Sequence, residues 1–135
     1  MSAGNFEVGQ SLEPLIKPEI SESQLADYAK VSEDHNPIHL DAEFAKGAGF
    51  PSVIAHGMIS MAFLGDYLRV HFPENRYQLQ KLKCRFRKVT FPGDRITCSG
   101  KVRRQDGDVL IVGLEARNQN GDLTTDAEAR VSPLS

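Results

Sequence analysis

The chain has 135 residues, of which 40% are hydrophobic and 25% charged, and its formal net charge is −2. This composition is typical of a globular protein with one core, so we expect residues 1–135 to form a single domain. The small charge argues against nucleic-acid and membrane-surface binding, and no apolar run approaches the roughly 20 residues of a membrane span. Two cysteines, Cys84 and Cys98, do not make a disulfide framework. With no export signal recognisable, we expect a reduced, cytoplasmic protein.

The first residues predict little regular structure before a helix begins. Residues 1–20 are expected to be extended or irregular, because Pro14 and Pro18 limit strand pairing. Ser21 and Gln24 then have the spacing of a capping box, in which each residue satisfies a backbone N–H of the other. The sequence therefore predicts a helix that begins at Ser21 and ends near residues 32–34.

Two further helices are expected before residue 72. Asp41 is a typical N-cap for a short helix over residues 42–46. A longer helix should begin at residue 56 or 57 and end near 71. The apolar residues of its first two turns cover most of its circumference, so something must wrap it. Gly65 would cost about 1 kcal/mol in an exposed helix, so it indicates either close packing or room for a ligand.

From residue 77 onward the pattern changes to strands separated by turns. Four strands are expected, at residues 78–90, 95–104, 109–117 and 123–131. The run over 109–117 is apolar on both faces, as in a central strand. Helices followed by antiparallel strands favour an α+β fold. A long apolar helix before such a meander indicates the hot-dog arrangement, in which an antiparallel sheet wraps a central helix.

Asp34 and His39 are the first candidates for chemistry. Pro37 lies between them and pushes Asn36 out of the helical region, so the segment should be a turn. A turn can direct both side chains into one small volume. A carboxylate and an imidazole that share a water molecule are suited to proton transfer near neutral pH. The alternative is a solvated junction between helix and loop with two incidental polar residues.

Four segments together resemble the MaoC-like dehydratase family, in particular its (R)-specific enoyl-CoA hydratases and (3R)-hydroxyacyl-ACP dehydratase subunits. They are Asp34-x-Asn36-Pro37-x-His39, Phe44, His56-Gly57-Met58 and Phe91-Pro92-Gly93-Asp94. The resemblance implies a hot-dog fold with an overhanging segment, residues 21–52, before the central helix. It also implies reversible addition of water to trans-2-enoyl thioesters of CoA or acyl carrier protein, giving (3R)-3-hydroxyacyl thioesters. The family's catalytic aspartate and histidine fall on Asp34 and His39, its supporting asparagine on Asn36 and its oxyanion glycine on Gly57.

The chemistry of that reaction fits these residue types. Asp34 and His39 can activate a water for attack at C3 and deliver a proton to C2, each contributing roughly 10²–10⁴-fold, with either one as the acid. The N–H of Gly57 would lie unpaired at the positive end of a helix, and losing such an oxyanion donor typically costs about 10²–10³-fold. His56 is expected to be structural. No cofactor is expected beyond the CoA or phosphopantetheine of the substrate, because the thioester itself makes C2 acidic.

A metal site is not expected. His35 and His39 have the i, i+4 spacing of a zinc pair, but Pro37 breaks the helix that would align them and no third ligand is apparent.

The candidates for contact with the substrate are of two kinds. An acyl pocket could be lined by Met58, Met61, Ala62 and Gly65, which could equally be plain core. A basic row could contact CoA phosphates or an acidic carrier protein, or could be an ordinary solvated sheet face: Lys83, Arg85 and Arg87, with Lys81 and Lys88 beside them.

A single wrapped sheet would leave open edge strands, so we expect a homodimer whose sheets join edge to edge. A heteromer with a second hot-dog subunit is the alternative. Two rival functions remain at this point: an acyl-thioesterase on the same fold, and a non-catalytic stabilising subunit of a heteromeric dehydratase. The presence of Asp34, His39 and Gly57 counts against the second.

Overall fold

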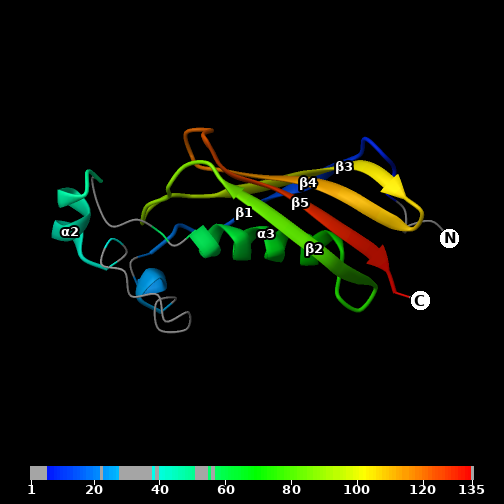
Figure 1. The fold of residues 1–135 in the computed structure, drawn as a ribbon, viewed down its shortest axis with the longest axis horizontal. Coiled ribbons are helices and arrows are strands. Elements are labelled where there is room, and N and C mark those ends of the chain that lie inside the picture. The colour runs from blue at the N-terminus through cyan, green and yellow to red at the C-terminus, as the bar shows by residue number, and fades with distance from the viewer. Residues whose placement is uncertain are drawn as a thin grey trace.

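The computed structural model describes residues 6–21, 23–27, 38, 40–50, 55 and 57–134, with only the backbone of Met58. Its labelled elements are β1 (Ser11–Ile16), α2 (Ala42–Gly47), α3 (Gly57–His71), β2 (Tyr77–Phe86), β3 (Thr97–Asp106), β4 (Val109–Arg117) and β5 (Leu123–Pro133), and residues 23–27 are helical. The strands form one antiparallel sheet in the order β1-β3-β4-β5-β2. Figure 1 shows α3 lying along one face of this sheet. This is the hot-dog fold that the sequence predicted.

The core lies between α3 and the middle of the sheet. Alternate residues of β3 and β4 point toward the helix, as the two-residue period of a strand requires. They are fully buried against apolar side chains of α3: Cys98, Val102, Leu110, Val112, Leu114 and Ala116 against Phe63, Leu64, Tyr67 and Leu68. Each large side chain buried in this way contributes about 1.5–3 kcal/mol. The strand β4 is central, as its apolar sequence predicted.

One strand was missed by the sequence analysis. Residues 11–16 form β1, an edge strand paired with β3, although an extended or irregular segment with little pairing was expected there. The expected lack of pairing was wrong because Pro14 lies at a register shift between Leu12 and Leu15, at the edge of the sheet. At such a position a missing backbone N–H removes no central ladder bond. The sheet therefore has five strands instead of four.

The other bounds agree closely with prediction, except that β2 ends at Phe86 and not at residue 90. It ends early because the N–H groups of Arg87 and Lys88 both donate to the carbonyl of Thr124, at 2.8 and 3.1 Å. The strand β3 correspondingly runs two residues later than expected. The helix α3 begins at Gly57 and ends at His71, as predicted.

The two predicted N-caps, Ser21 and Asp41, are confirmed. The N–H of Gln24 donates to Ser21 Oγ at 3.0 Å, and the N–H of Ser21 donates to Gln24 Oε1 at 3.4 Å. The carboxylate of Asp41 accepts from the N–H groups of Glu43 and Phe44, at 3.0 and 3.2 Å. These bonds satisfy donors that a helix leaves free in its first turn.

The two cysteines are unpaired and lie in β2 and β3. Burial raises the pKa of Cys98 to about 11. Burial, and then the charge of Asp126, also raise the pKa of Cys84. Both thiols are therefore protonated at neutral pH and are poor nucleophiles. None of the described helices is both long and apolar enough to cross a membrane.

Candidate active site

The N-terminus of α3 is the described part of the candidate site. Gly57 is the first residue of this helix, and no acidic residue lies in its first turn. The backbone N–H groups there have no partner within the helix and lie at the positive end of its dipole. Because no carboxylate of the first turn competes for them, they are suited to bind an oxygen that carries negative charge.

Two chain segments that lead into the site are held by one turn. The N–H of Ala55, two residues before α3, donates to the carbonyl of Thr90 at 2.7 Å. Ile20, directly before the first helix start, donates to the carbonyl of Asp94 at 2.9 Å and accepts from the N–H of Gly93 at 2.6 Å. The segment over residues 90–94 therefore fixes where the overhanging segment leaves the sheet and where it returns to α3.

The turn itself is rigid. The N–H of Asp94 donates to the carbonyl of Phe91 at 3.0 Å, and the Asp94 carboxylate accepts from the N–H of Phe91 at 2.9 Å and from Gln119 Nε2 at 3.0 Å. Gly93 has φ +92°, a conformation that other residues rarely adopt. The sequence predicted this turn, but not that it anchors Ile20 and the start of α3. Nothing in a turn motif shows which distant segment it binds.

The overhanging segment is described at both its ends. Figure 1 shows α2 and the helical residues 23–27 beyond the end of the sheet from which α3 starts. In α2, Ala45 is buried while Phe44 is 50% exposed, and Leu40, just before the helix, is 44% exposed. Two large apolar side chains of the described overhang are therefore exposed.

The predicted proton-transfer residues lie outside the described part of the chain. These are Asp34 and His39, together with the supporting residues Asn36 and His56. Of the predicted catalytic set the structure places Gly57, at the start of α3. The juxtaposition of Asp34 and His39 therefore stays a prediction.

The predicted acyl-binding residues lie on one side of α3. Met61 and Gly65 are partly buried and Ala62 is exposed, on the face that turns away from the sheet, and the side chain of Met58 is outside the described part. A Cβ on Gly65 would meet no atom nearer than Arg69 Nη1, at 3.8 Å. Close packing therefore does not explain Gly65 within this chain. The sheet covers the other face of α3, and among the described residues nothing covers this one apart from the side chains around Asp66.

A charged cluster of Lys17, Asp66 and Arg69 lies along one side of that face. Lys17 Nζ lies 3.0 Å from Asp66 Oδ2 and 5.3 Å from the centre of the Phe63 ring, and Arg69 binds the same carboxylate. Burial raises the pKa of Asp66, but hydrogen bonds from Lys17 and Arg69 outweigh this and hold the pKa below its usual value. The cluster ties the residue after β1 to the middle of α3.

The predicted basic row divides into two parts. Lys83 and Arg85 are exposed on β2, opposite Glu128 and Asp126 of β5, and make no ion pair with another described residue. Arg87 follows β2 and forms an ion pair with Asp126, with Nη2 and Oδ2 2.9 Å apart. Arg87 is therefore held against the sheet, whereas Lys83 and Arg85 remain available to a ligand.

The chain belongs to the MaoC like domain family, whose model matches residues 4–119. It is 30% identical over 133 residues to the (R)-specific enoyl-CoA hydratase of Aeromonas caviae, covering 97% of this chain and 98% of the relative. The family match and the similarity to this hydratase together identify the protein as a hydro-lyase. They support hydration of enoyl thioesters as its general class of reaction.

Two solved structures share the fold over nearly the whole chain. The R-hydratase PhaJ1 of Pseudomonas aeruginosa, in its unliganded form, matches with a TM-score of 0.88 and 28% identity, covering 98% of this chain and 84% of the other. The (R)-hydratase of A. caviae involved in PHA biosynthesis matches with a TM-score of 0.86 and 30% identity, covering 96% and 98%. The likeness extends from β1 to β5, so it includes the framework around the start of α3.

Proposed function

We propose that this protein reversibly hydrates trans-2-enoyl thioesters to (3R)-3-hydroxyacyl thioesters. The observation that carries the proposal is the start of α3 at Gly57, with no acid in its first turn, in a chain that matches an (R)-specific hydratase from end to end. A helix N-terminus of this kind stabilises an oxyanion, and the thioester oxygen becomes one when water adds to the conjugated double bond.

Each step of the addition has a residue to perform it. Asp34 and His39 hold one water, and the water oxygen bonds to C3 as its proton passes to one of the two side chains. The electrons of the C2–C3 double bond move toward the thioester oxygen, which the N–H of Gly57 stabilises. A proton from the pair then reaches C2. Asn36 supports the turn that carries both residues, and His56 has a structural role as a hydrogen-bond partner of the overhanging segment.

The substrate is proposed to carry CoA or the phosphopantetheine of an acyl carrier protein. Lys83 and Arg85 are exposed and unpaired among the described residues, so they can contact phosphates or an acidic carrier protein. The acyl chain would lie on the open face of α3 beside Met58, Met61, Ala62 and Gly65. The reaction needs no further cofactor or metal in this proposal.

The test is the loss of enoyl-thioester absorbance with crotonyl-CoA, with thiol release followed in parallel. The wild type should consume the absorbance without releasing thiol. Asp34→Asn and His39→Ala should each lower kcat/KM about 10²–10⁴-fold while the circular dichroism spectrum stays unchanged. Glu43→Gln, an exposed acid in α2, is the matched control and should keep full activity. Thiol release by the wild type would indicate a thioesterase, and near-normal rates in both site variants would refute the assignment of the pair.

A further inference from the structure

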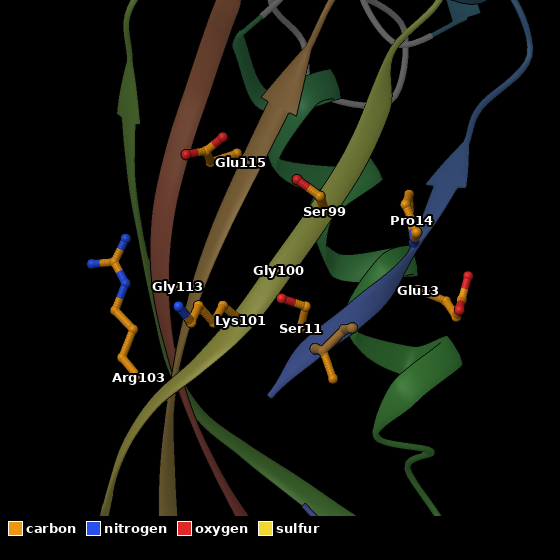
Figure 2. A pocket seen from close by; sticks show the side chains of 10 residues that line it. Ser11, Glu13, Pro14, Ser99, Gly100, Lys101, Arg103, Gly113 and Glu115 are labelled. Carbon is orange, nitrogen blue, oxygen red and sulfur yellow. The ribbon is translucent and has the colours of Figure 1, made fainter. Parts of the chain in front are cut away.

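A groove of about 510 Å³ lies on the face of the sheet opposite α3, between β1, β3 and β4. In β3, Cys98 and Val102 point into the core, so the alternating residues Ser99 and Lys101 point to the other side. Figure 2 shows the groove and its lining side chains. Lys83 and Arg85, which the proposed hydration assigns to the substrate, lie on the same face but on β2, which does not line the groove.

Three irregularities of the sheet converge on this groove. The strand β1 has a register shift between Leu12 and Leu15, and β3 has one between Val102 and Arg104, which leaves Arg103 as an extra residue. The third is Gly113, in the middle of the central strand β4. A bulge disrupts the ladder and redirects a side chain, and glycine weakens a strand interior. Two bulges and an interior glycine each lower the stability of the sheet, so their occurrence around one cavity indicates that the cavity binds a ligand.

The bulge in β3 directs Arg103 onto Gly113. A Cβ on Gly113 would lie 2.0 Å from Arg103 Nε and 2.5 Å from its Cζ, so the guanidinium fills the space of the missing side chain. Lys101 is the direct cross-strand neighbour of Gly113, and Ser11 of β1 is the neighbour of Lys101. Figure 2 shows the Lys101 and Arg103 side chains both directed toward Gly113.

The two cations are not held by an ion pair within the described part of the chain, although Glu128 of β5 is the other cross-strand neighbour of Gly113. Neither Lys101 nor Arg103 makes an ion pair or a side-chain hydrogen bond with another described residue. Glu13 also lines the groove, but in Figure 2 it points to the opposite side of β1 from Lys101. Two like charges held together favour an anion between them. Arginine offers a planar fork that matches phosphate oxygens, to which lysine adds a second charge.

The rest of the groove adds polar groups to this pair of cations. The hydroxyls of Ser11 and Ser99 line the same cavity and can donate to anionic oxygens. Glu115, the cross-strand neighbour of Ser99, stands at one end, where Arg117 holds its Oε2 at 2.9 Å and its other oxygen can accept from a hydroxyl or amino group of a ligand. The lining therefore suits a small molecule with one phosphate group and a polar, uncharged or amino-bearing remainder.

We propose that this groove binds the phosphate group of a small molecule, through Lys101 and Arg103 above Gly113. The phosphate could be that of a free phosphorylated metabolite or that of the nucleotide part of a CoA thioester. The site is separate from the candidate active site and stands whether or not the proposed hydration is correct.

The experiment is a titration of the full chain with inorganic phosphate and, separately, with adenosine 3′,5′-bisphosphate. Binding is monitored by the shift in the thermal denaturation midpoint and by NMR signals of the arginine Nε–H groups. Ionic strength is held constant with chloride. Both readouts should show saturable binding, because a ligand that binds only the folded state stabilises it. Arg103→Gln and Lys101→Gln should each weaken binding roughly ten- to hundredfold, as expected for loss of a charged hydrogen bond. Gly113→Ala should do the same by displacing the guanidinium.

Arg104→Gln is the matched control, because it removes the same charge from the next residue of β3, which does not line the groove. It should leave the affinity unchanged. Binding of the bisphosphate together with a raised KM for crotonyl-CoA in Arg103→Gln would identify the CoA nucleotide as the source. Saturable phosphate binding with an unchanged KM would identify a free metabolite. Equal responses of Arg103→Gln, Arg104→Gln and the wild type, or a chloride titration that reproduces the effect, would overturn the proposal.

Discussion

At the scale of single residues, Tyr67 carries an unmet hydrogen bond inside the core. It is fully buried, and its hydroxyl makes no hydrogen bond of normal geometry with a described residue, although the backbone of Gly100 lies close enough to oppose the rise of its pKa. Burial raises the pKa of Tyr67 to about 12, so the group is neutral. A buried hydroxyl without a partner costs about 1–3 kcal/mol, so Tyr67→Phe should leave the free energy of unfolding unchanged or raise it by about 1 kcal/mol. Urea denaturation measures this. A loss above about 1 kcal/mol would show that the hydroxyl does have a partner.

Gly100 is the neighbour that leaves room for the ring of Tyr67. A Cβ on Gly100 would lie 3.0 Å from Leu114 Cδ2, 3.1 Å from Tyr67 Cε2 and 3.2 Å from the carbonyl oxygen of Gly113. Because one of these atoms is backbone and the others are buried, Gly100→Ala should lower the free energy of unfolding by about 1–3 kcal/mol.

A matched control for this change is Gly47→Ala, at the end of α2. A Cβ there would have nothing within 4 Å, and the backbone of Gly47 needs no positive φ. This variant should be neutral or stabilising by about 0.4–1 kcal/mol, since alanine restricts the unfolded chain. Equal effects of the two substitutions in thermal denaturation would contradict the packing that the structure gives Gly100.

Residues whose role is local were predictable from the sequence, and those whose role depends on distant contacts were not. The caps at Ser21 and Asp41 follow from short-range spacing and are confirmed. The approach of Arg103 to Gly113 depends on a bulge, and the anchoring of Ile20 depends on a turn more than seventy residues away. Gly113, a glycine inside an otherwise apolar strand, is a sequence signal for the groove that the prediction of a central strand over 109–117 did not use.

At the scale of elements, the ion-pair cluster joins the end of β1 to α3. Asp66 has a pKa below its usual value of 3.8 in the folded protein, so its ionised form favours folding. That contribution is complete above the unfolded pKa and is lost as the pH falls through the lower folded pKa. Since its side chain is 41% exposed, Asp66→Asn should cost no more than about 1 kcal/mol at pH 7. The difference from wild type should shrink as the pH falls below about 4.

The control for this effect is Asp106→Asn. Asp106 is 77% exposed and lies 3.8 Å from Arg130, so the pair is weak and solvated. Chemical denaturation at pH 7 should find no loss of stability in this variant. A loss in Asp66→Asn that persists unchanged at low pH would mean that the negative charge of Asp66 is not what the substitution removes.

Elements were predicted well where one periodicity was long and uninterrupted. The helix α3 and the strand β4 have the expected bounds, because fifteen and nine residues of consistent pattern outweigh local ambiguity. The strand β1 was missed because its six residues contain Pro14, and only the tertiary position at the sheet edge makes that residue acceptable. The early end of β2 likewise depends on Thr124, a partner that the local sequence does not reveal.

At the scale of the whole molecule, the described residues leave the β2 edge of the sheet and one face of α3 uncovered. The strand β2 lies at the edge and has ten residues, enough to template pairing with another strand. Its Leu79 and Phe86 are 47% and 53% exposed, and Val70 of α3 is 60% exposed. An open strand flanked by exposed apolar side chains is what a second hot-dog chain would cover. The same contact would complete the enclosure of α3 that its apolar sequence predicted.

We therefore predict a dimer that forms through β2. Sedimentation velocity should find the wild type dimeric at micromolar concentration, and Phe86→Asp should weaken the dimer at least about tenfold by placing a charge at the seam. Val8→Asp, at a residue 57% exposed before β1, is the matched control and should leave the dimer intact. If the open face of α3 holds the acyl chain between two subunits, activity in Phe86→Asp should fall in proportion to the remaining dimer. A wild type that sediments as a monomer with full hydratase activity would refute both the pairing and its role in the site.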